Sequence, residues 1–144
     1  ASWSDFRIIR AQLTGTSLDD PTTTTRGRTI PYAVFATPEL ARIGLSEGEA
    51  REAGLDVRIA QVPTAAIPRA KTMRYAGEGF WKAVVDANTH QILGATLIGP
   101  NVSEVITAVH VAIAGGLTYE QLRFLPIAHP TMGEGLQVLF DSLG

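Results

Sequence analysis

Apolar residues recur at helical spacing near the start of the chain and then stop. Trp3, Phe6, Ile9 and Leu13 lie three or four positions apart with polar or charged residues between them, which predicts one short amphipathic helix. Residues 14–29 contain four consecutive threonines and an Asp-Asp-Pro run, and they offer almost nothing to bury. We therefore expect residues 1–29 to be a helix and a linker outside the core, with the natural partner of the helix missing.

From Pro31 the pattern becomes dense and its period shortens. Short apolar or alternating runs predict strands at 32–35, 40–43, 57–62, 80–85 and 91–98. The last two strands flank the polar turn Asp86-Ala87-Asn88-Thr89-His90, which is typical of a β-hairpin, and we expect His90 to be exposed there. Because the residues that strand 91–98 directs to each of its two faces are largely apolar, we expect the sheet to be covered on both faces.

The predicted helices follow capping signals. Ser46, Asn101 and Thr118 each begin a box that has Glu or Gln three residues later, and these boxes predict helices at 46–53, 101–114 and 118–124. Helix 101–114 has a fully apolar stripe, and its other side, which includes His110, is small and poor in charge. A helix of this kind is central to a fold or faces another chain. We interpret His110 as a structural histidine at such an interface.

Composition narrows the function classes. Hydrophobic residues make up 45% of the 144 residues and charged residues 18%, and the formal net charge is -2, which indicates neither disorder nor a basic nucleic-acid surface. No apolar run is long enough to span a bilayer, and the first residues do not resemble a signal peptide, so we expect a cytoplasmic protein. The chain contains no cysteine, which excludes disulfides, thiolate metal sites and a cysteine nucleophile within it.

The candidate chemistry lies near the C-terminus, in the run Ala128-His129-Pro130-Thr131-Met132-Gly133-Glu134. Thr131 and Glu134 have capping-box spacing, which predicts a helix that starts here and continues through Leu136, Leu139, Phe140 and Leu143. His129 then lies just outside the helix N-terminus, with Glu134 about one turn inside and able to fold back toward it. A carboxylate beside an imidazole fixes its tautomer and favours the imidazolium, as in a general acid/base. Capping alone would also explain Glu134.

Other candidate sites are weaker. Arg69, Lys71 and Arg74 form a basic cluster in a stretch, 65–76, whose structure the pattern does not predict. The cluster is typical of a solvated face, with anion binding as the alternative. Gly77-Glu78-Gly79 lacks the third glycine of a dinucleotide fingerprint, and no two histidines have metal-ligand spacing. The sequence therefore predicts no metal site and no cofactor-binding residue.

Three groups of residues together resemble a known family. They are the run from Pro31 to Phe35 followed by Pro38 to Ser46, the run Gly94-Ala95-Thr96-Leu97-Ile98-Gly99-Pro100, and His129-Pro130-Thr131 with Glu134. In this order they resemble the C-terminal dimerisation domain of the flavin-dependent pyridine nucleotide-disulfide oxidoreductases, in the mercuric reductase-like or dihydrolipoamide dehydrogenase-like branch. Residues 2–10 also resemble the helix that follows the flavin-binding domain in the mercuric reductase-like branch.

The resemblance implies an α+β fold for residues 30–144, with an antiparallel sheet of about five strands covered by helices, and a homodimer. It implies that residues 1–29 are a remnant of the preceding flavin-binding region. It also implies that His129 reaches the partner subunit's redox-active cysteine pair as an acid/base, held by Glu134. FAD and NAD(P)H would then be bound by the upstream domains of the parent protein, none by this fragment, and the fragment would be inactive alone.

Two other interpretations stay open. The chain could be a non-catalytic homodimerisation module in which His129 merely packs, or a small-ligand binder that uses the basic cluster. The resemblance also leaves the electron acceptor undecided, because mercuric reductases carry a C-terminal cysteine pair where this chain ends in Phe140-Asp141-Ser142-Leu143-Gly144.

Overall fold

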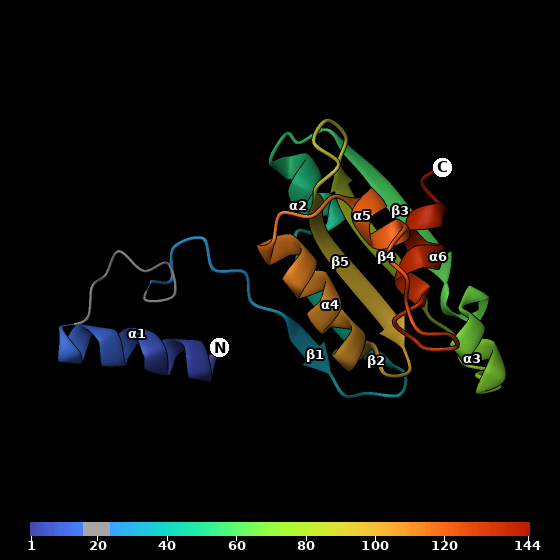
Figure 1. The fold of residues 1–144 in the computed structure, drawn as a ribbon, viewed down its shortest axis with the longest axis horizontal. Helices are drawn as coiled ribbons and strands as arrows, with labels where there is room; N and C mark the ends of the chain where they lie inside the picture. Colours follow the sequence, from blue (N-terminus) through green and yellow to red (C-terminus); the bar gives the residue numbers. More distant parts are fainter. Residues whose placement is uncertain (16–23) are drawn as a thin grey trace. The chain divides into compact units, whose positions relative to one another are not determined.

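The computed structural model of the chain describes residues 1–15 and 24–144 (Figure 1). Contacts divide it into two compact units, Ala1–Ile30 and Pro31–Gly144, which are described separately. Half of the predicted linker, residues 16–23, lies outside the described residues. Among the helices that are described, none combines the length and apolarity needed to cross a membrane.

The first unit is built on helix α1, Ser2–Thr14, as the apolar spacing predicts. Gly15 ends the helix with φ 65°, a left-handed conformation that glycine adopts without steric cost. Arg28 lies against the N-terminal part of the helix, with Nη1 2.6 Å from Asp5 Oδ1. The apolar stripe itself is exposed within the described residues: Trp3, Phe6, Ile9 and Leu13 all remain accessible to solvent.

The second unit contains one five-stranded antiparallel sheet, as expected from the resemblance. Its strands, in chain order, are β1 Tyr32–Val34, β2 Glu39–Gly44, β3 Val57–Pro63, β4 Phe80–Asp86 and β5 Ile92–Gly99. In space the order is β1-β2-β5-β4-β3, so the predicted β4–β5 hairpin occupies the centre and β3 is an edge strand. The predicted positions of all five strands are confirmed to within a few residues.

The helices connect and cover these strands. They are α2 Glu47–Glu52, the 3₁₀ turn η2 Thr64–Ala66, α3 Pro68–Thr72, α4 Val102–Ala114, α5 Tyr119–Arg123 and α6 Gly135–Asp141. The capping boxes predicted at Ser46 and Thr118 are both formed. The box predicted at Asn101 is wrong. That residue has φ 57° and its side chain caps nothing, whereas Glu39 Oε2 accepts hydrogen bonds from the backbone N–H and the hydroxyl of Ser103 (3.2 and 2.8 Å).

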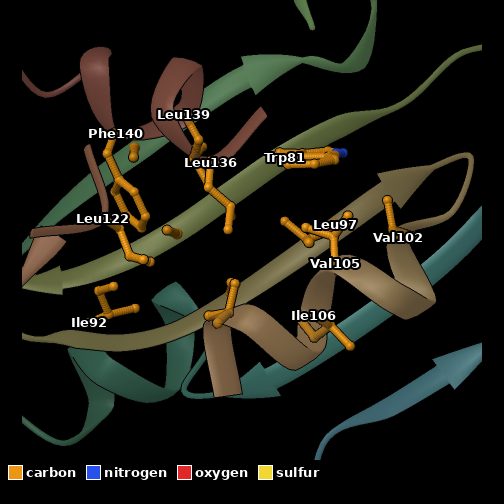
Figure 2. Close-up of a cluster of buried hydrophobic side chains, with 14 of the residues drawn as sticks. Trp81, Ile92, Leu97, Val102, Val105, Ile106, Leu122, Leu136, Leu139 and Phe140 are labelled. Atoms are coloured by element: carbon orange, nitrogen blue, oxygen red, sulfur yellow. The ribbon is translucent and has the colours of Figure 1, made fainter. Parts of the chain in front are cut away.

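The hydrophobic core lies between one face of the sheet and helices α4, α5 and α6 (Figures 1 and 2). Trp81 and Leu97 of the central strands share this core with Leu136, Leu139 and Phe140 of α6, and none of these five is more than 1% exposed. Leu97 lies beside Val102 and Val105 of α4 (Figure 2). Gly135 lies so close to the Trp81 ring that a Cβ there would be 2.6 Å from Cζ3. The C-terminal helix is therefore packed directly on the sheet.

The opposite face of the sheet is only partly covered, so the expectation of two covered faces is wrong for the described residues. Arg42, Thr96 and Lys82 are cross-strand neighbours on this face and are half-buried. A groove of about 500 Å³ lies between these strands and the start of α2. The prediction assumed strict alternation along β5, which puts Ile92 on the opposite face from Ala95 and Leu97. A β-bulge next to Val84 shifts the register, so that all three residues are buried in the core.

Candidate functional site

The segment between α5 and α6 carries the predicted histidine on the surface. The segment leaves α5 at Phe124, runs without regular structure, and is anchored near its start by Gln137 of α6, whose Nε2 donates to the Leu125 carbonyl (2.7 Å). The side chain of His129 is 67% exposed. The imidazole is thus presented outward, and packing does little to determine its orientation.

Glu134 lies directly behind this imidazole. Its Oε1 and Oε2 are both 2.9 Å from His129 Nδ1, and its own side chain is only 17% exposed. A carboxylate only accepts hydrogen bonds, so Nδ1 carries the proton in this contact. Within the described part of the chain the hydrogen bonds of the ring are confined to Nδ1, which leaves Nε2 with a lone pair that can accept a proton.

The helix start at this site differs from the prediction. The Thr131 hydroxyl accepts the Glu134 N–H (3.2 Å), as in a capping box, but the Glu134 carboxylate binds His129 instead of returning to the Thr131 N–H. A turn follows, and α6 begins only at Gly135. One of the two hydrogen bonds of the predicted capping box is therefore formed, and the contact between Glu134 and His129 takes the place of the other.

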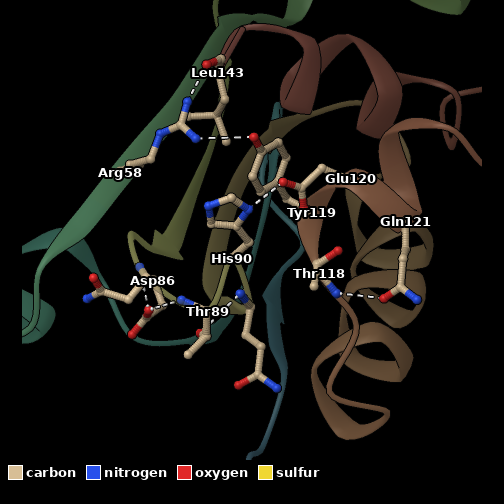
Figure 3. Close-up of polar contacts among 11 residues, drawn as sticks. Arg58, Asp86, Thr89, His90, Thr118, Tyr119, Glu120, Gln121 and Leu143 are labelled. Carbon is tan, nitrogen blue, oxygen red and sulfur yellow. Dashed lines mark hydrogen bonds and ion pairs between the residues drawn. The ribbon is translucent and has the colours of Figure 1, made fainter.

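The other two histidines have different surroundings. His90 is not simply exposed as predicted: its Nδ1 lies 2.5 Å from Glu120 Oε1 at the start of α5, and its ring is near Tyr119 (Figure 3). Burial acts to raise the pKa of Glu120, but hydrogen bonds from its own backbone, Thr118 and His90 outweigh burial, so this pKa lies below its usual value. His110 is half-buried on α4, and its side chain makes no hydrogen bond with any described residue.

The contact between His90 and Glu120 belongs to a larger polar cluster that the sequence did not reveal. Arg58 of β3 donates to the Tyr119 hydroxyl (3.1 Å) and to the Leu143 carbonyl, tying the C-terminus to the sheet (Figure 3). Tyr119 and Leu143 lie 61 and 85 positions after Arg58, so no local spacing could have identified these contacts. Their contacts hold α5 and the chain end against the sheet.

The structure does not assemble the basic cluster into an enclosed site. Arg69 and Lys71 lie on the five-residue helix α3 and Arg74 follows it, and all three are exposed. Arg69 donates to Thr72 of the same helix (3.4 Å). For residues 1–15 and 24–144, no group of three or more histidine and carboxylate side chains is arranged to hold a metal ion.

Comparison with known proteins gives consistent matches over this domain. The profile of the family described as pyridine nucleotide-disulphide oxidoreductase, dimerisation domain, matches residues 30–139. The probable pyridine nucleotide-disulfide oxidoreductase RclA of Escherichia coli K12 is 40% identical over 140 residues, which is 97% of this chain and 31% of RclA. A dihydrolipoyl dehydrogenase of Bacillus subtilis strain 168 is 39% identical over 105 residues, which is 73% of this chain and 22% of that enzyme.

Solved structures give the same result. The structure titled HOCl-induced flavoprotein disulfide reductase RclA from Escherichia coli superposes with a TM-score of 0.85 at 40% identity and covers 97% of this chain. The chain spans about a third of that protein's length. The predicted α+β fold with a five-stranded antiparallel sheet is thereby confirmed.

Proposed function

The chain belongs to the pyridine nucleotide-disulphide oxidoreductase family through its dimerisation domain, and from this premise we propose that His129 and Glu134 are the acid/base pair of a flavoprotein disulfide reductase. The pair acts on a redox-active cysteine pair of the partner subunit in a two-fold homodimer. The observation that carries this proposal is an exposed imidazole whose Nδ1 is bound by a carboxylate and whose Nε2 makes no hydrogen bond with any described residue.

The chemistry of disulfide exchange needs such a group. A thiolate, not a thiol, attacks a disulfide sulfur, so a base must take the thiol proton and later return it to the leaving thiolate. In the proposed step, His129 Nε2 accepts that proton, and Glu134 stabilises the imidazolium that forms. Because this chain has no cysteine, both sulfurs come from outside it.

The partner surface we propose is the outer side of α4, together with the segment that carries His129. Val111 projects from α4 with 65% of its surface exposed, and Thr107 and Ala114 near it are small or uncharged. Phe124 and Leu125, which precede the histidine segment, are also exposed. A two-fold dimer uses the same patch on both subunits, so one apolar, charge-poor helix face can cover its own copy.

The remaining parts of the active site lie outside this chain in the proposal. Upstream domains of the full-length protein would hold FAD and NAD(P)H, and these cofactors would supply the electrons for reduction of the disulfide. Residues 1–29 are the end of that flavin-binding region, and residues 30–144 alone turn over no substrate. In this arrangement the chain supplies the proton-transfer group and the contact between subunits.

Turnover of the full-length protein tests the catalytic role. We expect His129→Gln to lower the rate of disulfide reduction by roughly 10²–10⁴-fold, the usual contribution of a positioned acid/base. The reduction of the flavin by NAD(P)H, followed by stopped-flow absorbance, is expected to stay near the wild-type rate. Glu134→Gln is expected to give a smaller loss, because the imidazole remains.

The second histidine and carboxylate pair provides a matched control. His90→Asn removes the imidazole that contacts Glu120, and asparagine tolerates the positive φ of 61° at this position. Turnover of this variant is expected to stay near the wild-type value. If His129→Gln were equally active, the chain would be a homodimerisation module without a catalytic role.

Sedimentation of wild type and Val111→Glu tests the interface separately. Val111→Glu is expected to shift the protein from dimer to monomer.

A further inference from the structure

The Thr131 hydroxyl uses both its donor and its acceptor to close the segment that holds the pair. It donates to the Ala128 carbonyl (2.8 Å), on the residue before the histidine, and it accepts the Glu134 N–H (3.2 Å). One side chain therefore ties the backbone on the histidine side to the backbone of the acid. The segment from 128 to 134 becomes a closed ring of hydrogen bonds, with Glu134 bound to His129 across it.

Two complete capping boxes, at Ser46 and Thr118, show what is different here. Glu49 accepts the Ser46 N–H (2.7 Å), and Gln121 accepts the Thr118 N–H (2.9 Å), so in both boxes the third residue returns to the cap. At Thr131 the returning contact is missing because the Glu134 carboxylate is directed to the imidazole. The hydroxyl thus does more than begin a helix, since α6 starts four residues later at Gly135.

We propose that Thr131 is the positioning residue that sets the geometry of His129 relative to Glu134. The imidazole is two-thirds exposed, so side-chain packing leaves its orientation open and the hydrogen bonds decide it. Without the hydroxyl, the Ala128 carbonyl and the Glu134 N–H lose these hydrogen bonds. The backbone segments that carry His129 and Glu134 are then no longer held at a fixed distance from each other. The catalytic consequence of this inference rests on the function proposed above, whereas the geometric part does not.

NMR of the 144-residue chain tests the geometric part. Thr131→Val keeps the shape of the side chain and removes the hydroxyl, and Thr131→Ser keeps the hydroxyl. At neutral pH, wild type and Thr131→Ser are expected to show His129 protonated at Nδ1, with that proton visible in a slowly exchanging downfield signal. In Thr131→Val the signal is expected to disappear and the ¹⁵N shifts to move toward a mixture of tautomers.

A second threonine controls for general destabilisation. Thr118→Val removes the same kind of cap from α5 but lies outside the His129 segment. It is expected to lower the melting temperature and leave the His129 signals unchanged. If Thr131→Val kept the Nδ1 proton and the wild-type ¹⁵N pattern, the inference would be overturned, whatever its effect on the melting temperature.

Turnover of the full-length protein separates this inference from the proposed function. One net hydrogen bond corresponds to roughly a 2- to 10-fold effect, so Thr131→Val is expected to lower kcat by that factor with little change in KM, and Thr131→Ser is expected to restore it. If Thr131→Val lost the NMR signature while His129→Gln kept full activity, the proposed function would be refuted and the positioning role would remain. If His129→Gln were inactive while Thr131→Val kept the wild-type kcat, the catalytic consequence of positioning by Thr131 would be refuted and the proposed function would remain.

Discussion

Replacing Gly135 by alanine tests how tightly the C-terminal helix is packed behind the His129 segment. A Cβ at this position would lie 2.6 and 2.8 Å from Trp81 Cζ3 and Cη2, and 2.8 Å from Ile67 Cδ1. All three atoms belong to side chains that are completely buried, so they have little room to move. The substitution should push α6 away from β4, and with it the backbone next to Glu134.

The magnitude follows from these distances. Carbon atoms in contact normally lie about 3.5–4.0 Å apart, so the helix and its neighbours must separate by about 1 Å. Overpacking of this kind costs about 1–3 kcal/mol. Alanine recovers at most about 1 kcal/mol through its better helix propensity. We expect a net loss of about 1–2 kcal/mol, which corresponds to a melting temperature lower by about 3–7 °C for a domain of this size.

Urea and thermal unfolding, followed by circular dichroism, provide the assay, with Gly133→Ala as the control. A Cβ on Gly133 would meet nothing closer than 3.7 Å, which is ordinary contact, so this variant should unfold like wild type. Adding Trp81→Phe to Gly135→Ala should recover part of the lost stability, because the smaller ring leaves room for the alanine Cβ. Equal stability of Gly135→Ala and Gly133→Ala would refute the packing argument.

Three further predictions concern contacts far from His129. Glu39→Ala should lose about 1 kcal/mol by removing the cap of α4, whereas Asn101→Gly should be close to neutral in urea unfolding. Thr64→Val should cost about 1–3 kcal/mol in the same assay, because its buried hydroxyl satisfies a β5 carbonyl. The pKa of Glu120 is lowered, so its stabilisation is present above the usual glutamate pKa and lost as pH falls through the folded value. Glu120→Gln should therefore remove about 0.5 kcal/mol at neutral pH and progressively less in melts at pH values below the usual glutamate pKa; a loss that does not change with pH would contradict the role of the hydrogen bonds to the Glu120 carboxylate.

The sequence alone determined the features that depend on near neighbours. Apolar spacing located α1 and α4, alternation and turn residues located the β4–β5 hairpin, and the Ser46 and Thr118 boxes marked two helix starts. His129 and Glu134 belong to the same class, because five residues separate them in the chain and a turn is enough to bring them together. Interactions within a few residues are encoded in local spacing and can be read from it.

Tertiary structure decided what depends on residues far apart in the chain. The β-bulge moved Ile92 into the core, Glu39 replaced Asn101 as the cap of α4, and Glu120 engaged His90 from 30 positions away. A polar side chain binds the partner that the folded chain brings within reach, and strand order and register establish which partner that is.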